Sequence, residues 1–358
     1  MFEILKKIES FGFEAYIVGG YVRDYLLGKI SNDIDICTNA TPLQIKEIFP
    51  QAKTPEKDFQ SVILKLDKYN YEITSYRQDI SYQNNRQPAT YKLVKTLEED
   101  LKRRDFTINT LCLDSNGNII DLFNAQEDLS NKVIKTVRDP FLSCEEDILR
   151  VLRAIRFSTV LDFELDVNLM KAIQEKGYLL KNLSYDRKKE ELNKIFKSNN
   201  ILKGIKLLIK LKLDPILELN NLNKVIITND SLGIWSQLNV LDIYPFSRQD
   251  KKDILLINKL VSNKKIDLET IYYYGLRLCL IAGQILNISD VLEMNEKLVI
   301  KSFKDIEIDL NKYYFEDKKW IKELCQLLEI KIINGDLKND YQEIDKFVKD
   351  YLKTKNML

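Results

Sequence analysis

The stretch YIVGGYVRDYLLGKISNDIDICT, residues 16–38, decides the fold prediction for this chain of 358 residues. An apolar run leads into Gly19-Gly20, an apolar segment ends at Gly28, and Asp33 and Asp35 alternate with isoleucine. This order predicts a strand over residues 15–18, a glycine turn, a helix to Leu27 closed by Gly28, and a second strand over 33–38.

The flanking sequence extends this unit into an α/β head. A short amphipathic helix is predicted before it, and Thr41-Pro42 opens another in the manner of a cap followed by proline. The polar run with a proline at residues 77–91 reads as a mobile loop. Further strands are predicted over residues 62–66 and 71–76, and 106–113 and 118–122 flank the hairpin signal Asn116-Gly117.

After Pro140 strand patterns give way to helical periodicity, first over residues 146–161, then over 188–197 and 201–213, and onward to the end. The coarse architecture is therefore an α/β head followed by an all-helical part.

Composition excludes several kinds of site. The chain has no histidine, which rules out histidine metal ligands and histidine general bases, so the chemistry rests on carboxylates. Its five cysteines have no CxxC spacing, so we expect neither zinc nor disulfides, and a reducing cytoplasm as the location. No membrane segment is predicted. The net charge of +1 gives no nucleic-acid signal, but ten of the twelve arginines precede residue 188.

Asp33 and Asp35 are the candidate metal ligands and catalytic residues. On a strand, residues two apart project from the same face, so both carboxylates can bind divalent cations. Such oxygen ligands suit Mg²⁺, and two ions can stabilise the attacking and leaving oxygens of an in-line displacement. The N–H groups of Gly19 and Gly20 can cradle phosphates, with Arg23 one turn into the helix. The alternative is a charged strand edge beside an ordinary turn.

Four segments resemble the motifs of one family, in family order. GGYVRDYLLG (19–28) with DID (33–35) is similar to the signature of class II nucleotidyltransferases in the polymerase β superfamily. LEEDLKRRDFTINT (97–110) resembles the second motif of these enzymes, and EEDILRVLRAIRF (145–157) resembles their template motif. SYRQDISYQNNRQP (75–88) resembles the flexible loop of enzymes that add CCA to tRNA. The chain is thus identified as a member of the CCA-adding tRNA nucleotidyltransferase family.

The template motif also has an independent argument. Cytosine and adenine both present an amine donor beside a ring-nitrogen acceptor, whereas uracil and guanine present a carbonyl and an N–H. A carboxylate with a guanidinium therefore fits C and A. Asp147 and Arg150, three residues apart on the predicted helix, are the candidate pair. Arg156 would point nearly opposite Asp147. The four residues Asp147, Arg150, Arg153 and Arg156 therefore cannot all read one base together.

The resemblance implies further nucleotide-binding residues. Arg104 matches the second arginine of RRDFT, while Arg103 or Asp105 could simply pair on the surface. Arg153 and Arg156 would support phosphates or buttress the site, the alternative being a salt-bridge ladder on a solvated helix. Glu72 is a candidate third carboxylate, or an exposed strand residue. Arg77, Asp79 and Arg86 resemble loop residues that switch such enzymes from C to A addition, or form a charged, solvated loop.

By this resemblance the head has a mixed, mostly antiparallel sheet. The predicted domains are a catalytic head (1–138), a neck with the template helix (139–200), a body (201–300) and a tRNA-binding tail (301–358). One departure from the family is KDFQSVIL (57–64), which lacks the usual His and Gly-Thr and puts contacts near Phe59 to Val62 in doubt.

The expected activity is Mg²⁺-dependent addition of CCA to tRNA from CTP and ATP. A-only or CC-only addition, a poly(A) polymerase, and an inactive tRNA-binding protein stay open as alternatives. No protein partner is indicated, and both a monomer and a homodimer remain possible.

Overall fold

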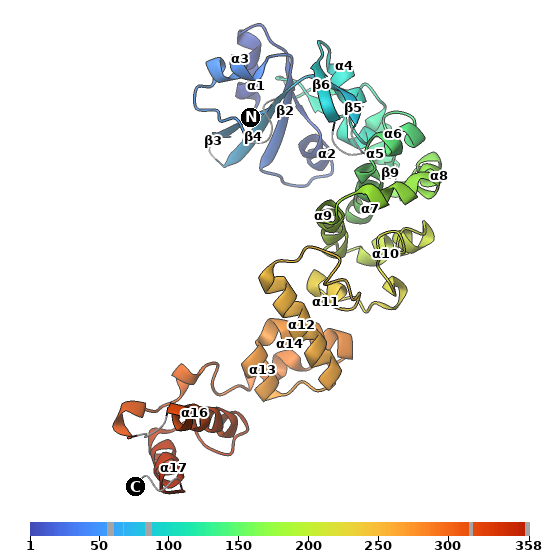
Figure 1. Cartoon of the computed structure of the whole chain (residues 1–358). Coiled ribbons are helices and arrows are strands. Elements are labelled where there is room, and N and C mark those ends of the chain that lie inside the picture. Colours follow the sequence, from blue (N-terminus) through green and yellow to red (C-terminus); the bar gives the residue numbers. More distant parts are fainter. Residues whose placement is uncertain (56–60, 67, 83–87, 315–317, 355–358) are drawn as a thin grey trace. The chain divides into compact units, whose positions relative to one another are not determined.

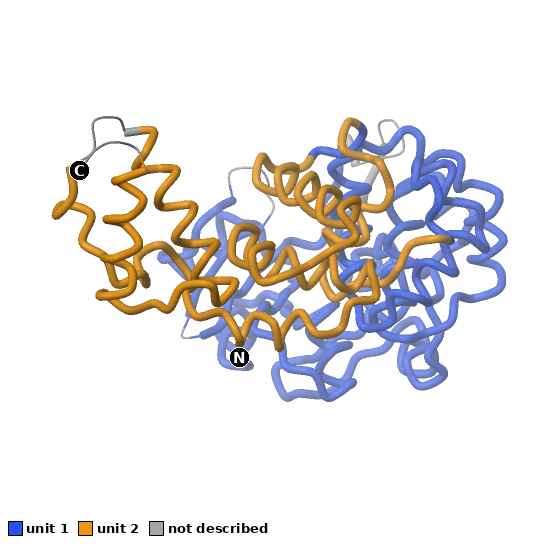
Figure 2. Tube along the Cα trace, turned by 90° about the horizontal axis from the view of Figure 1, so that it is seen from below, with its two compact units in different colours: residues 1–223, 243–245 blue, residues 224–242, 246–358 orange. Residues whose placement is uncertain are grey.

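The computed structural model of the chain describes residues 1–55, 61–66, 68–82, 88–314 and 318–354 (Figure 1). It divides into two compact units, residues 1–223 with 243–245 and residues 224–242 with 246–358 (Figure 2). Among the described residues, every strand belongs to the first unit and the second unit is helical. The fourfold division into head, neck, body and tail stays a prediction.

The head is built on a six-stranded sheet with the order β3-β4-β2-β1-β7-β8. Strand β2 runs parallel to β4, and the other neighbouring strands are antiparallel. The prediction of a mixed, mostly antiparallel sheet is confirmed. The bounds are β1 Ala15–Val18, β2 Asp33–Thr38, β3 Ser61–Leu66, β4 Tyr69–Ser75, β7 Cys112–Leu113 and β8 Ile119–Ile120.

Three helices of the head follow local signals in the sequence. Helix α1 (Phe2–Ser10) buries Leu5 and Ile8. Helix α2 (Gly20–Leu26) fills the predicted place between β1 and β2. Helix α3 (Pro42–Ile48) begins with a capping box, in which the side chains of Thr41 and Gln44 each bond to the other's backbone. The strand and helix predictions for residues 15–38 are therefore confirmed almost to the residue.

The prediction of a loop over residues 77–91 is wrong for its two arms. Strands β5 (Arg77–Tyr82) and β6 (Pro88–Leu93) form a separate antiparallel ribbon with a register shift after Asp79. A polar composition does not exclude a two-stranded ribbon, because backbone groups make its ladder and the start of β5 is held by the bond from the N–H of Arg77 to Oδ1 of Asp100 at 3.1 Å. A proline is tolerated as a strand's first residue.

The hairpin at Asn116-Gly117 is confirmed, but both of its strands, predicted over 106–113 and 118–122, are only two residues long. Only Cys112–Leu113 pairs with β8, and residues 107–109 form a short 3₁₀ helix. The hydroxyl of Thr110 donates to the carbonyl of Thr107 at 2.7 Å, and Asn109 donates to Asp105 at 2.9 Å. Such local side-chain bonds favour a turn over an extended strand.

The remainder of the first unit is mainly helical, apart from a two-residue parallel pair, β9 (Val133–Ile134) with β10 (Glu164–Leu165). Figure 1 shows these helices following the sheet from cyan through green. The bounds are α4 Leu97–Lys102, α5 Ala125–Ser130, α6 Pro140–Glu146, α7 Leu149–Leu161, α8 Val167–Lys176, α9 Tyr185–Phe196 and α10 Ile201–Lys210.

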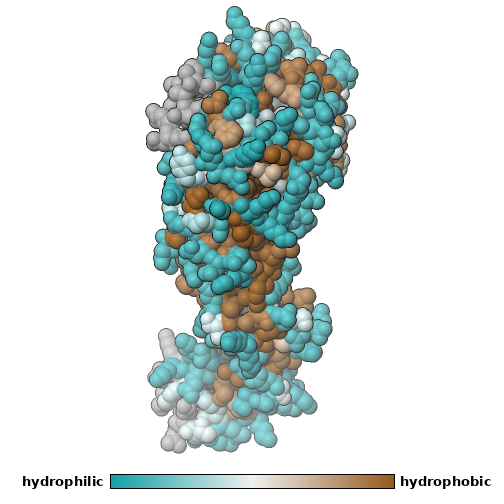
Figure 3. Space-filling model, turned by 90° about the vertical axis from the view of Figure 1, so that its right-hand side faces the viewer, coloured by the Kyte–Doolittle hydropathy of each residue, from teal (hydrophilic) through white to brown (hydrophobic). Residues whose placement is uncertain are grey.

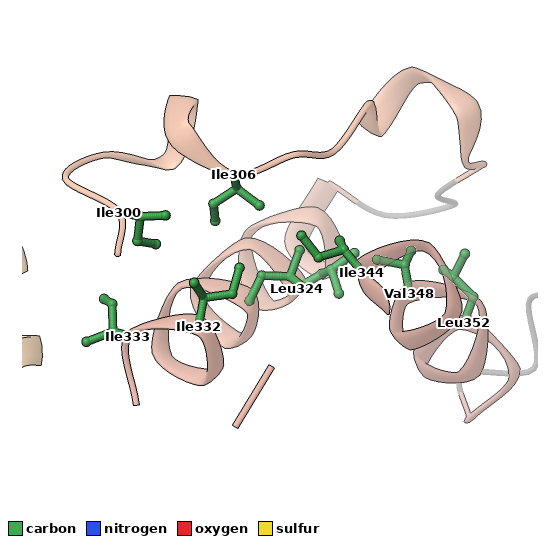
Figure 4. Packing of buried hydrophobic residues seen from close by; sticks show 9 residues of the cluster. Ile300, Ile306, Leu324, Ile332, Ile333, Ile344, Val348 and Leu352 are labelled. Atoms are coloured by element: carbon green, nitrogen blue, oxygen red, sulfur yellow. The ribbon is translucent and has the colours of Figure 1, made fainter. Parts of the chain in front are cut away.

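The second unit contains seven α-helices among its described residues, which confirms the all-helical prediction for the C-terminal part. Its last two helices pack through a compact apolar cluster that includes Leu324, Ile344 and Val348 (Figure 4). The bounds are α11 Ser231–Ser236, α12 Arg248–Asn263, α13 Leu268–Tyr274, α14 Leu276–Leu286, α15 Val291–Glu296, α16 Lys318–Ile333 and α17 Tyr341–Thr354.

The surface drawn in Figure 3 is mainly hydrophilic, with hydrophobic residues exposed in patches. None of the helices in the described ranges has the length and apolar character needed to cross a membrane.

Candidate active site

The two carboxylates predicted to bind metal lie on one face of β2, an interior strand of the sheet that pairs with β4 on one side and β1 on the other. Asp33 and Asp35 alternate with buried Ile34 and Ile36 on β2, so they share the face opposite to these isoleucines. The register places Asp35 beside Glu72 of β4. The pKa of Asp35 is raised mainly by desolvation and also by Glu72 and Asp33, against the opposing effect of Arg104.

The carboxylates of Asp33 and Asp35 fit a divalent cation. Its donors are hard carboxylate oxygens, and the raised pKa of Asp35 means that its negative charge is poorly compensated. Within the described residues no group of three or more acidic, cysteine or histidine side chains is arranged to hold a metal ion alone. Two carboxylates with the remaining ligands from substrate and water is a typical arrangement for Mg²⁺.

Gly19 lies against the side chains of Arg104 and Asp35, and its position requires glycine. Its φ of +80° disfavours other residues, and a Cβ there would lie 3.1 Å from Nη1 of Arg104 and 3.6 Å from Oδ2 of Asp35. The N–H of Gly19 donates to the carbonyl of Leu111 at 3.3 Å. A phosphate cradle at this turn therefore rests on the N–H groups from Gly20 onward.

Arg23 faces into the protein. It is 8 % exposed, and its Nη1 donates to Oδ1 of Asn109 at 2.7 Å while its Nε donates to Asp24 at 2.8 Å. The structure thus joins the GGYVRD and RRDFTIN segments through Arg23 and Asn109. Asn109 was not among the predicted site residues.

Arg104 and Arg103 are both held by Asp100, which sequence reasoning missed. The side chain of Asp100 is 1 % exposed and accepts from Nε of Arg103 at 2.9 Å, from Nη2 of Arg104 at 3.5 Å and from the backbone N–H of Arg77 at 3.1 Å. The surface pairing considered for Arg103 is wrong, because its partner is buried. Asp100 fixes Arg104 beside Gly19 and also the start of β5.

Asp105 is a second partner that packs inside the unit rather than pairing on the surface, with a side chain that is 10 % exposed. It accepts from Nε of Arg153 at 2.7 Å and from Nδ2 of Asn109 at 2.9 Å. Burial would raise its pKa, but Arg153 and these hydrogen bonds outweigh that effect and lower the pKa to about 2. The surface interpretation failed because it ignored the long-range contact with α7.

Replacing Asp105 with asparagine should remove an acid-sensitive share of the stability. The pKa is lowered on folding, so the carboxylate stabilises the fold above its ordinary pKa and loses this effect as the pH falls toward about 2. We expect a loss of ~2 kcal/mol at pH 7. Urea unfolding at pH 7 and pH 3 measures it: the gap between wild type and variant should shrink at pH 3, and an equal gap at both pH values contradicts the assignment.

The candidate template residues are not on one helix, contrary to the prediction. Helix α6 ends at Glu146, Asp147 is extended (φ −138°, ψ 98°), and α7 begins at Leu149. The Oδ1 of Asp147 accepts from the N–H of Leu149 at 3.0 Å, so the aspartate ends α6 in a side-chain turn that leads into α7 instead of continuing the old helix. Burial raises the pKa of Asp147, and the positive charge of Arg150 opposes this effect. The two groups therefore still interact electrostatically.

Arg150 is buried and held by backbone and side-chain acceptors. Its Nη1 donates to Oγ of Ser143 at 2.9 Å, and its Nη2 donates to the carbonyl of Arg103 at 3.0 Å. Nη1 also donates to the carbonyl of Ser143 at 3.3 Å and to Oε2 of Glu146 at 3.4 Å. A guanidinium has five N–H donors, so Nε and the second N–H of Nη2 are the donors that these bonds leave for a base edge.

Arg153 and Arg156 do not form a salt-bridge ladder along α7. Arg153 pairs with Asp105 at 2.6 Å, and Nε of Arg156 lies 2.8 Å from Oε2 of Glu191 on α9. Glu191 is 3 % exposed and, like Asp100, was missed. Both arginines are therefore braced from other segments, which agrees with the buttressing role that the sequence suggested.

The predicted loop residues are only partly visible. Arg77 begins β5, and Asp79 pairs with Tyr91 in the β5–β6 register. Arg86 lies outside the described residues, as does Phe59 of the segment that departs from the family pattern. Val62, at the end of that segment, is buried in β3.

Comparisons with known proteins agree with this geometry. The family described as the Poly A polymerase head domain matches residues 15–135, and the family described as a probable RNA and SrmB-binding site of polymerase A matches residues 162–219. A CCA-adding enzyme of Ligilactobacillus salivarius is 32 % identical over 98 % of this chain and 96 % of its own length. The chain belongs to the CCA-adding enzyme family.

Solved structures of CCA-adding enzymes share the fold. The Bacillus stearothermophilus CCA-adding enzyme in complex with CTP superposes with a TM-score of 0.79 at 23 % identity, over 99 % of this chain and 97 % of that chain. The Thermotoga maritima CCA-adding enzyme complexed with tRNA gives a TM-score of 0.70 at 21 % identity, over 98 % and 94 %. Members of the CCA-adding enzyme family are tRNA nucleotidyltransferases and use divalent metal ions, so the predictions of an enzyme and of its family are confirmed.

Proposed function

We propose that the chain adds the terminal CCA to tRNA from CTP and ATP and releases pyrophosphate, with Asp33 and Asp35 binding Mg²⁺. The observation that carries the proposal is that the side chains of Asp35 and Arg104 both lie against the turn at Gly19. When bound, Mg²⁺ supplies positive charge for the attacking and leaving oxygens. We take the cytoplasm as the location, since the cysteines are free.

The residues of the chain divide the work between reaction and choice of base. Asp33 and Asp35 supply the oxygen ligands, while Arg23, Arg104, Arg153 and Arg156 supply donors for phosphate groups. Asp147 and Arg150 supply an acceptor and a donor that fit the Watson–Crick edges of cytosine and adenine. The tRNA 3′-hydroxyl attacks the α-phosphate, the bond to the β-phosphate breaks, and pyrophosphate leaves.

The test uses tRNA transcripts that end before the CCA, after the first C and after CC, each with single labelled nucleotides. A CCA-adding enzyme incorporates C on the first two and A on the third. Incorporation of A alone, of C alone, or of long A tracts would identify the A-only, CC-only or poly(A) alternative. Binding without transfer at any Mg²⁺ concentration would identify an inactive tRNA-binding protein.

Exchange of Glu72 for glutamine separates its two candidate roles. If Glu72 is a third metal ligand, transfer should fall by about a hundredfold or more. If it is only a neighbouring charge, transfer persists, and the pKa of Asp35 falls because one source of repulsion is gone. The acid limb of the pH–rate profile then moves to lower pH. We expect the second outcome, because the register places Glu72 beside Asp35 but no three acidic side chains of the described residues are arranged to hold a metal ion together. Full activity with an unmoved acid limb would contradict both roles.

A further inference from the structure

Phe157 on α7 is the point at which three arginines of the proposed nucleotide site converge. The Cζ atom of Arg156 lies 4.0 Å from the centre of its ring, that of Arg23 lies 5.0 Å away, and that of Arg153 lies 5.4 Å away. All three fall within the ~6 Å over which a cation is attracted by an aromatic ring. Arg23 comes from α2 and the other two from α7, so one ring joins separate segments.

The ring itself is held in place. Phe157 is 7 % exposed and packs edge to face against Phe106, with ring centres 5.6 Å apart and an interplanar angle of 81°. Phe106 is fully buried and belongs to the RRDFTIN segment. A buried ring fixed by a second ring is a rigid platform, because its orientation is set by packing and not by solvent.

The three guanidinium groups need such a platform. Their distances to the ring centre limit any two of their Cζ atoms to at most 10.4 Å apart, the sum of 5.0 and 5.4 Å. Like charges this close repel, because their separation does not exceed about one Debye length and salt screens partly buried charges less. Each arginine has its own carboxylate partner: Arg23 pairs with its neighbour Asp24 on α2, Arg153 with Asp105, and Arg156 with Glu191 on α9. The ring is the one group that all three share among the contacts of the described residues.

We propose that Phe157 is a positioning residue: its ring holds Arg23, Arg153 and Arg156 in one array that binds the triphosphate of the incoming CTP or ATP. This inference rests on the proposed function and adds to the site a residue whose side chain has no polar atom. Phe157 does not touch the reacting atoms. It acts through the guanidinium groups, whose planar forks bind phosphate oxygens well only when their orientation is fixed.

The test compares Phe157→Leu with Phe157→Tyr and with a matched control, Phe163→Leu. Phe163 is 2 % exposed in the same unit and loses the same volume outside the arginine array. We expect Phe157→Leu to raise KM for CTP and ATP about tenfold while KM for tRNA stays unchanged. Phe163→Leu should lower Tm to a similar extent without changing either KM, and Phe157→Tyr should restore KM to near the wild-type value.

A second measurement covers the case in which Phe157→Leu does not fold. Phenylalanine analogues with increasing ring fluorination at position 157 keep the shape and weaken the negative face of the ring. The Kd of CTP, measured at equilibrium without tRNA, should rise with each step of fluorination. A Kd independent of fluorination overturns the proposal, as does an equal KM for Phe157→Leu and Phe163→Leu, or a change confined to KM for tRNA. Failure of the wild type to transfer C or A would instead overturn the proposed function.

Discussion

Asp35→Asn is expected to lower the rate of C and A addition at least ~10³-fold, because a cation that stabilises both the attacking and leaving oxygens contributes several kcal/mol to the barrier. Asparagine keeps the size and one oxygen of the side chain but removes the charge that binds the cation. Single-turnover transfer to tRNA measures the loss, and a filter-binding Kd for tRNA should remain near the wild-type value.

Stability separates this effect from misfolding. The folded-state pKa of Asp35 is raised, so the folded protein binds more protons than the unfolded chain between the ordinary pKa of 3.8 and the raised value. Stability therefore falls as the pH rises through that window, and the ionised carboxylate destabilises the metal-free fold above it. Asp35→Asn removes this cost, so its Tm in the presence of a chelator should equal or exceed that of the wild type.

Glu47→Gln is the matched control, since Glu47 is an exposed carboxylate on α3 of the same head. It should retain full transfer and an unchanged Tm. Retained transfer in Asp35→Asn would contradict the metal assignment. A lowered Tm with a proportional loss of transfer would mean that Asp35 has a structural role only.

The sequence predicted the region around Asp35 well because the signals there are local. Alternation fixes β2, the capping box fixes α3, and the positive φ of Gly19 is a property of a single turn. Such patterns depend on neighbours within about four residues, which one sequence displays directly.

Two of the three arginine partners depend on long-range packing, since Asp105 pairs with Arg153 and Glu191 pairs with Arg156. Asp100 was also missed, although it pairs with Arg103 and Arg104 only three and four residues further along the chain, because its burial cannot be seen in the sequence. A weak signal was present, since Asp100 lies between buried Leu97 and Leu101 at helical spacing, on the apolar face of α4. A charged residue on the apolar face of a helix requires a buried partner, and this rule would have selected it.

The break between α6 and α7 shows the opposite failure. Helical periodicity runs through residues 146–161, but Asp147 accepts a hydrogen bond from the N–H of Leu149 and leaves the helical conformation. Aspartate competes with the helix for backbone N–H groups, so a periodic pattern cannot distinguish a helix interior from a cap. The consequence concerns the proposed template residues: Asp147 lies at a bend, so the expectation that Arg156 points nearly opposite Asp147, which assumed one continuous helix, does not apply.

Arg150→Lys is expected to relax the choice of base. Lysine keeps the charge but has one ammonium in place of a planar fork, so it cannot reach the acceptors at Ser143 and Arg103 and also donate to a base. A bidentate contact contributes ~1–3 kcal/mol to discrimination, so selectivity for CTP over UTP should fall by about tenfold to a hundredfold. Competition between labelled CTP and UTP on tRNA lacking CCA measures this ratio directly.

Arg138→Lys provides a close control for this change. Arg138 pairs with Glu146, the same carboxylate that lies 3.4 Å from Arg150, but its side chain is 40 % exposed. It makes the same chemical substitution within the same charge cluster, so it removes one fork without altering the proposed template. Its selectivity should equal that of the wild type. If Arg150→Lys kept full selectivity while transfer slowed, Arg150 would support the bend at Asp147 and the base would be read by other groups. A loss of selectivity confined to Arg150→Lys places the choice of C and A at the junction of α6 and α7, away from the carboxylates that drive the reaction.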